Sequence, residues 1–449
     1  MKRFVNTLKN IWNIKDLRAK IIYTLALVLI YRIGSYVVIP GINPATLTNL
    51  QTQTQNGVLG LLNMFSGGAF SNASIFALGI MPYITASIIM QLLTMVVPYF
   101  TKMQREGESG RRKINQMTRW LTIIVTIFQS FAYLANLRYQ IGHATIYSIT
   151  GSDSLTFMNF TLPIAILLTC GTLFVMWLGE RITDKGIGNG ISLLIMVGIV
   201  ARLPFALFSE FVSKVEEQGG GLVIFFVELL FLIVVIMLCI LLVQGTRRIP
   251  VQYAKRIVGN KQYGGVRQYI PIKVNAAGVM PIIFAQAIMF IPVTLSGFSG
   301  DGVSAIAVAL SDFQGFWYNL IFALLIIVFT YFYTAVAINP KQMSDDMKKN
   351  GGFIPGIKPG KKTEEFLDNV LSKITLPGSI FLAFVAIMPA IIGPLFNAGT
   401  QFAHFYGGTS LLIMVGVVLD TLQQIESHLL MRHYDGLTKT GRIKGRSNL

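Results

Sequence analysis

Ten long apolar stretches run through this sequence and decide what it can fold into. A helix needs about 20 apolar residues to cross the roughly 30 Å hydrocarbon core of a bilayer, and apolar runs with helical spacing indicate such spans. Several stretches contain Gly or Pro, which the interior of a span tolerates. The sequence therefore predicts an all-α polytopic membrane protein with ten transmembrane helices. The expected spans lie near 21–39, 74–97, 119–137, 157–178, 190–208, 220–243, 275–297, 315–338, 374–394 and 408–430.

The charges are few and unevenly placed. Only 13% of the 449 residues are charged, against about 25% in an average globular chain, yet the net charge is +17. Thirty-three of the 37 Lys and Arg residues fall in the N-terminal segment, the connections after even-numbered spans and the C-terminal tail. Basic residues favour the cytoplasmic side, so both termini are expected there. The first span is too long for a cleavable signal, and the apolar runs exclude a soluble nucleic-acid-binding body.

A few basic and ionisable residues depart from this pattern. Of the Lys and Arg residues, only Arg138, Arg202 and Lys214 are counted with the connections after the third and fifth spans, although Arg202 lies near the end of the fifth span itself. The ionisable residues inside expected spans are Arg32, Glu228, Asp420 and Glu426. Such a group is a functional hypothesis by default, and a pairing of Arg32 with Asp420 and a structural role both stay open. A secondary transporter for a small solute, the alternative function, usually carries more carboxylates at the midplane.

No catalytic constellation is found. The four histidines form no zinc-binding pattern, and neither a Gly-x-Ser-x-Gly elbow nor a lysine-tipped phosphate loop occurs. The glycine-rich run 186–190 follows a span rather than a strand and is interpreted as a tight turn. Cys170 and Cys239 lie inside expected spans, where packing roles are expected. The sequence predicts no enzyme, no cofactor and no metal site.

Two cytoplasmic connections are longer than a turn requires. The connection 245–273 has no acidic residue and interleaves Tyr253, Tyr263 and Tyr269 with its basic side chains. Arg and aromatic side chains suit phosphate and base contacts, so a polyanionic partner is expected. For the connection 339–373, which also holds five acids, a solvated orientation signal or attraction to anionic lipid heads stays open. The candidate docking residues are Arg247, Arg248, Lys255 and Arg256 in the first connection and Lys348, Lys349 and Lys358 in the second.

The segment 57–72, between the first two spans, is apolar and uncharged but too short to cross a membrane. Non-helical backbone at membrane depth must be buried in protein or line a water-filled cavity. A short re-entrant helix that ends near Gly67 and Gly68 fits these properties. An ordinary extracytoplasmic loop folded over the protein is the alternative.

Several motifs then match a known family in order along the chain. They are GGAFSNASIFALGIMPYITAS at 67–87, GESGRRK at 107–113, WLGE at 177–180 with GIGNG at 186–190, YAKR at 253–256, PGIKPG at 355–360 and GGTSLLI at 407–413. In these residues the chain resembles the SecY family, the channel subunits of bacterial protein-translocation complexes. One departure is Lys358, which stands where the family usually has arginine. Lysine keeps the charge but loses the planar, two-pronged donor.

The resemblance implies a protein-conducting channel. Its ten spans would form two inverted halves, 1–212 and 213–449, hinged between the fifth and sixth spans. The expected partners are the subunits SecE and SecG, the motor ATPase SecA, the ribosome through its RNA, signal-bearing polypeptides and membrane lipids. The re-entrant segment would be a plug, with core residues Gly60, Leu61, Leu62, Asn63, Met64, Phe65, Ser66, Gly67 and Gly68.

The resemblance also implies a pore ring and a lateral gate. The ring residues would be Ile80, Ile84, Ile191, Ile195, Ile283 and Ile413. The first two pairs are spaced i,i+4, so each pair shares one helix face, and a ring of aliphatic side chains can close a pore by excluding water. Spans 2, 3, 7 and 8 would form the gate toward lipid. Its polar residues would be Thr85, Gln129 and Asn275.

Overall fold

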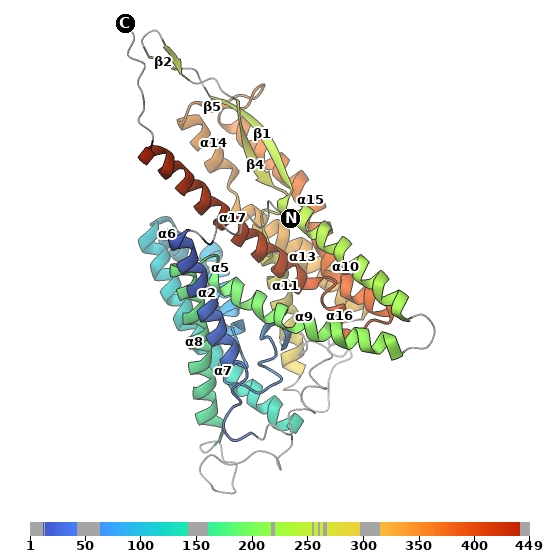
Figure 1. Ribbon diagram of the computed structural model, residues 1–449. Coiled ribbons are helices and arrows are strands. Elements are labelled where there is room, and N and C mark those ends of the chain that lie inside the picture. The colour runs from blue at the N-terminus through green and yellow to red at the C-terminus, as the bar shows by residue number, and fades with distance from the viewer. Residues whose placement is uncertain are drawn as a thin grey trace. The chain divides into compact units, whose positions relative to one another are not determined.

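The computed structural model describes residues 12, 14–42, 63–141, 160–216, 221–253, 256–258, 261–263, 267–296 and 315–440. Helices dominate these residues (Figure 1). Within them, seven helices are long and apolar enough to cross a membrane, and one sharply bent pair of helices makes an eighth. The prediction of an all-α polytopic membrane protein is confirmed.

The contacts between residues divide the chain into two compact units. The first contains residues 1–55, 59–202 and 417–449. Its helices pack in sequence, α5 and α6 on α7, α7 on α8, and α8 on α2. They are α2 (Lys15–Gly34), α5 (Met81–Val96), α6 (Pro98–Arg105), α7 (Glu108–Ile141), α8 (Leu162–Lys185), the first part of α9 (Gly190–Glu216) and the end of α17 (Gly408–Thr440).

The second unit contains residues 56–58 and 203–416. Its apolar helices pack mainly on α15, which contacts α10, α13, α14 and α16. Its helices are the rest of α9, α10 (Gly221–Gln244), α11 (Met280–Ser296), α13 (Phe316–Ala337), α14 (Pro340–Lys349), α15 (Lys361–Phe396), α16 (Thr400–Ala403) and the start of α17. Its strands are β1 (Thr246–Tyr253), β2 (Arg256–Val258), β3 (Lys261–Tyr263), β4 (Arg267–Lys273) and β5 (Gly352–Phe353). The inverted halves 1–212 and 213–449 stay a prediction.

The second expected span differs most from the structure. The helix begins only at Met81 instead of residue 74, and residues 66–80 form turns and a bridge. Ser74 pairs with Val38 in an isolated β-bridge, and the Ile39 N–H donates to the Ala73 carbonyl at 2.8 Å. This pairing takes the backbone groups that a helix would use, so hydropathy alone placed the start of the span too early.

Candidate functional site

The re-entrant segment folds into a compact, buried turn. We call residues 63–72 the re-entrant turn; Gly60, Leu61 and Leu62 lie outside the described residues. The side chain of Asn63 accepts from the Ser71 N–H at 3.0 Å, and its carbonyl accepts from the Gly68 N–H at 2.8 Å. Residues 63–71 are all buried, which confirms the expectation of a segment covered by protein. Its role as a plug stays a prediction.

Two arginines reach the re-entrant turn from two helices. Arg32 of α2 donates through Nη1 to the Gly67 carbonyl at 3.0 Å. Arg202 of α9 donates through Nη2 to Asn63 Oδ1 at 3.2 Å and to Ser71 Oγ at 3.0 Å. Hydrogen bonds from an ionised donor are stronger than neutral ones. The sequence analysis kept a pairing of Arg32 with Asp420 open. In the structure Asp420 is exposed, and Arg32 contacts the re-entrant turn instead.

The two glycines of the turn make room for these arginines. Gly67 and Gly68 have φ angles of +63° and +94°, which side chains other than glycine rarely adopt. A Cβ at Gly67 would lie 2.8 Å from Arg32 Nη1, and one at Gly68 would lie 2.5 Å from Arg202 Nη2. The GlyGly pair therefore permits both the shape of the turn and the close approach of two guanidinium groups.

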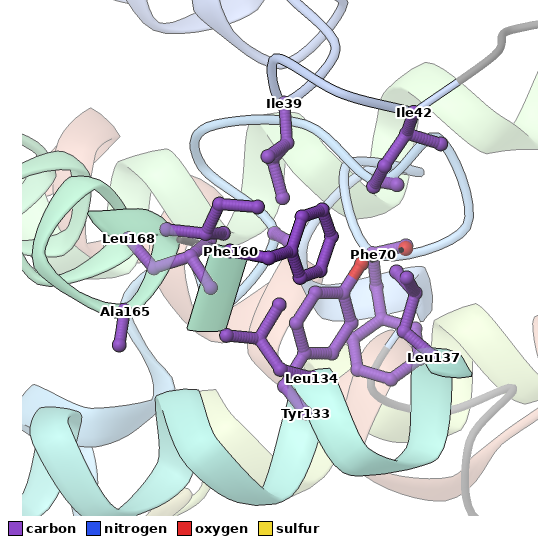
Figure 2. Close-up of a cluster of buried hydrophobic side chains, with 12 residues drawn as sticks. Ile39, Ile42, Phe70, Tyr133, Leu134, Leu137, Phe160, Ala165 and Leu168 are labelled. Atoms are coloured by element: carbon purple, nitrogen blue, oxygen red, sulfur yellow. Dashed lines mark hydrogen bonds between the residues drawn. The ribbon is translucent and has the colours of Figure 1, made fainter. Parts of the chain in front are cut away.

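A hydrophobic cluster anchors the far side of the turn (Figure 2). The Tyr133 hydroxyl of α7 donates to the Phe70 carbonyl at 3.0 Å, and the two rings meet edge to face with centroids 4.9 Å apart. Leu134 and Leu137 follow on α7, and α8 contributes Leu168. The end of the turn is thus fixed to two helices of the first unit.

One face of α9 carries both the expected ring residues and the contacts to the turn. Ile191, Ile195, Gly198 and Arg202 are spaced i, i+4, i+7 and i+11, which places them along one face of a helix. A Cβ at Gly198 would lie 2.7 Å from the Phe65 carbonyl, so the turn rests directly on this helix. At 1.5 Å per residue, Ile195 lies about 4.5 Å along the axis from Gly198.

The other ring and gate residues are divided between the units. Ile80 is buried at the start of α5 and Ile84 is half-buried in its first turn, whereas Ile283 of α11 and Ile413 of α17 belong to the second unit. Thr85 Oγ1 donates to the Met81 carbonyl of its own helix at 3.0 Å. The remaining gate residues are Gln129 on α7, which is half-buried, and Asn275 before α11, which is 7% exposed. Their roles stay predictions.

The two basic connections form one body in the second unit. Strand β1 pairs antiparallel with β4 and also with β5, where Gln252 faces Phe353. Below the strands, Ile249 and Val251 join Met347, Ile354 and residues of α15 in one hydrophobic cluster. The sequence predicted two separate loops because the β1–β5 pairing joins segments that are far apart along the chain.

The expected docking residues lie on this body as far as they are described. Arg247, Arg248, Lys348, Lys349 and Lys358 are exposed. Neighbouring residues of a strand point to opposite faces, so the two arginines do not act as a pair on one face. Lys255 lies outside the described residues, and for Arg256 only the backbone in β2 is described.

The motif at 355–360 is a structural turn. Gly356 and Gly360 have φ angles of +86° and +98°, and the Gly360 carbonyl accepts from Ser344 Oγ at 2.8 Å. The backbone carbonyl of Lys358 accepts from Thr363 Oγ1 at 3.0 Å, while its side chain is exposed. The lysine therefore stands in a turn whose backbone contacts do not depend on its side chain.

A buried ionic cluster was missed from the sequence. Lys214 Nζ lies 3.9 Å from Glu228 Oε1 and 4.0 Å from Glu210 Oε1, and all three side chains are at most 3% exposed. Lys214 also donates to the carbonyls of Phe396 and Asn397, at the C-terminal end of α15, where a cation is favoured. The Gly399 N–H donates to Glu210 Oε2 at 2.8 Å.

The sequence grouped Arg202 and Lys214 with the connection after the fifth span, but the helix continues beyond residue 208, to Glu216. Arg202 and Lys214 both lie inside α9. A charge inside an apolar helix is tolerated when it has partners. For Lys214 they include the nearby Glu210 and the distant carbonyl of Phe396, and for Arg202 the distant Asn63. Among the described residues, no three His, Cys, Asp or Glu side chains are grouped as a metal site would require.

Comparisons with known proteins agree with this architecture. The sequence model of the SecY family matches residues 74–422. "Protein translocase subunit SecY" of Streptomyces scabiei is 44% identical over 437 residues, which cover 94% of this chain and 97% of the relative. The protein of the same name from Halalkalibacterium halodurans is 44% identical over 441 residues, which cover 96% and 99%.

Two solved structures share the fold. One, described as "The structure of a protein conducting channel", aligns over 94% of both chains with a TM-score of 0.60 and 20% identity. The other, Sec61 in the canine ribosome-channel complex, aligns over 94% of both chains with a TM-score of 0.57 and 19% identity. At these identities the likeness concerns the fold alone.

Proposed function

This chain belongs to the SecY family of protein translocase subunits, and we propose that it passes unfolded polypeptides across the cytoplasmic membrane and releases transmembrane helices sideways into lipid. It is a multi-pass membrane protein and a protein-conducting channel subunit. The polypeptide would cross a ring of six aliphatic side chains, which offer no hydrogen bonds and therefore hold no particular sequence tightly. No observation favours a secondary transporter for a small solute.

The observation that carries the proposal is the single face of α9. Ile191 and Ile195 precede Gly198 and Arg202 on this face, and the re-entrant turn rests against the latter two. A closed channel needs a narrow apolar constriction and a segment that stops the path beside it. In our proposal the isoleucines form the constriction and the re-entrant turn is the plug.

We further propose that spans 2, 3, 7 and 8 form the lateral gate. Thr85, Gln129 and Asn275 would hold it closed through polar contacts between helices, each contributing about 0.6 kcal/mol on average. A strongly apolar signal helix gains comparable free energy for each Leu-sized residue that reaches lipid. Contacts of this size hold the gate closed at rest and yield to a signal helix.

The partners follow from the basic body formed by β1, β4, β5 and α14. Structural neighbours include Sec61 in a canine ribosome-channel complex and a yeast Ssh1 complex bound to the 80S ribosome. We propose that this chain likewise docks the ribosome through Arg247, Arg248 and Lys358, and that SecA uses the same basic body. The subunits SecE and SecG would complete the channel, and both chain termini would lie in the cytoplasm.

Reconstitution tests the function. Vesicles that contain this chain with its copurifying subunits should protect a signal-bearing polypeptide from added protease when a motor ATPase and ATP are supplied. The same polypeptide with a charged residue in the centre of its signal is the matched control. A saturable, ion-coupled flux of a small solute without polypeptide transport would contradict the proposal.

A further inference from the structure

We propose that Arg32 and Arg202 act as a two-point latch that holds the re-entrant turn in its closed position. This inference rests on the proposed role of that turn as the plug. The two guanidinium groups approach from different helices, α2 and α9, and each covers one glycine of the turn. The sequence marks both arginines as isolated charges among apolar residues, but it does not show that they meet at the turn.

Arg202 closes the turn on itself. Its Nη2 atom donates to Asn63 Oδ1 and to Ser71 Oγ, which lie at the two ends of the turn. The same Asn63 oxygen accepts from the Ser71 N–H, so one guanidinium joins a bond that already ties the two ends together. Loss of Arg202 therefore loosens both ends from α9 at once.

Arg32 supplies the second point of attachment. Its Nη2 donates to the Tyr36 hydroxyl at 3.0 Å, and its guanidinium carbon lies 5.2 Å from the centre of the Tyr36 ring. These contacts orient Nη1 toward the Gly67 carbonyl. Tyr36 is thus a positioning residue for Arg32, in the turn that directly follows α2.

The acceptors on the turn explain how such a latch can release. They are a backbone carbonyl, an amide oxygen and a hydroxyl, and none of the three carries a charge. A bond from a charged donor to a neutral acceptor is stronger than an ordinary neutral bond, yet water can replace the acceptor when the site opens. A carboxylate in the same place would hold each arginine far more firmly.

The latch should shift the closed-to-open ratio of the resting channel. Loss of one charge-assisted contact corresponds to about tenfold in an equilibrium between two states. The measurement is the resting ion leak of vesicles that contain the full channel complex. We expect R32Q and R202Q each to raise this leak about tenfold. R202K should give an intermediate leak, because lysine keeps the charge but ends in a compact ammonium group instead of the planar guanidinium whose Nη2 reaches both acceptors.

Controls separate the latch from a general loss of structure. R181Q makes the same substitution on α8, where Arg181 lies over the Trp177 ring and not at the turn, and it should leak like the wild type. Ser71→Ala removes one acceptor from a fully buried side chain and keeps its approximate size. If R202Q does not fold, S71A tests the same contact without altering a charge. The ion leak of S71A should also rise.

A deletion of residues 63–68 distinguishes the latch from the plug itself. This deletion spares Phe70 and its hydrophobic cluster. We expect the deletion to raise the ion leak, and we expect that adding R202Q to the deleted channel does not raise the leak further. If the deletion variant leaks while R32Q, R202Q and S71A leak no more than the wild type, the latch is overturned and the plug assignment stands. A tight deletion would overturn both. An R202Q effect of equal size in the deleted channel would assign Arg202 a merely structural role.

Discussion

Lys214 Nζ lies 3.9 Å from Glu228 Oε1, and the two side chains are 1% and 0% exposed. The pair joins α9 to α10, and the further bonds from Lys214 to the end of α15 extend the connection to a third helix. Burying two charges is costly, so removal of one partner leaves the other charge without compensation.

The first prediction concerns this cluster. K214M should lower the free energy of unfolding by about 3–5 kcal/mol, because two buried carboxylates lose their cation. The measurement is thermal or denaturant unfolding in detergent. K185M, at an exposed lysine in the last turn of α8, is the matched control and should stay within about 0.5 kcal/mol of the wild type. Equal stability of the two variants would show that the cluster contributes little.

The second prediction concerns the basic body. Reversal of Arg247, Arg248 and Lys255 to glutamate should weaken ribosome binding and make its salt dependence shallower, because fewer phosphate charges are neutralised. The measurement is cosedimentation over a series of salt concentrations. The control reverses Arg111, Arg112 and Lys113 on α7, which changes the net charge equally. If both triple variants lose binding equally, the docking site is not on this body.

The third prediction concerns the pore ring. Replacing Ile191 and Ile413 with glycine should raise the resting ion leak several-fold, because the constriction loses two branched side chains. Glycine also weakens a helix by about 1 kcal/mol, so I233G, at an exposed position of α10, serves as the control for that effect. An unchanged leak in the double variant would mean that the ring is misplaced.

The fourth prediction concerns pH. Burial lowers the pKa of His404, in the connection between α16 and α17, from 6.5 to about 4. Between these values the unfolded chain binds a proton that the folded chain does not, so stability falls as the pH decreases, by about 1.4 kcal/mol per unit. H404Q should flatten the stability profile between pH 6 and pH 5. Equal slopes in H404Q and the wild type would be the contrary result.

The sequence alone predicted the spans because hydropathy is a local property. The helices α7, α8, α9, α10, α13, α15 and α17 all cover expected apolar stretches. The start of α5 was misplaced because the bridge between Val38 and Ser74 depends on a partner outside the span.

The contacts of charged residues were beyond sequence reasoning for a related physical reason. A hydropathy scale assigns each charge a fixed cost, so it favours counting Arg202 and Lys214 with a connection. The structure reduces that cost through partners far away in the chain, which are Asn63 for Arg202 and the carbonyls of Phe396 and Asn397 for Lys214. The pairing of β1 with β5 also joins residues far apart in the sequence, so it could not be predicted. Because of this pairing, the two expected loops form one surface.

The most direct test of the central claim is a disulfide cross-link to a polypeptide halted during passage. The native Cys170 and Cys239 are first replaced, and single cysteines are then introduced at Ile191, Ile413 and the exposed Ile233. A cysteine in the halted polypeptide should form disulfides with Ile191→Cys and Ile413→Cys but not with Ile233→Cys. Translocation without a cross-link at either ring position would contradict passage of the polypeptide through this channel.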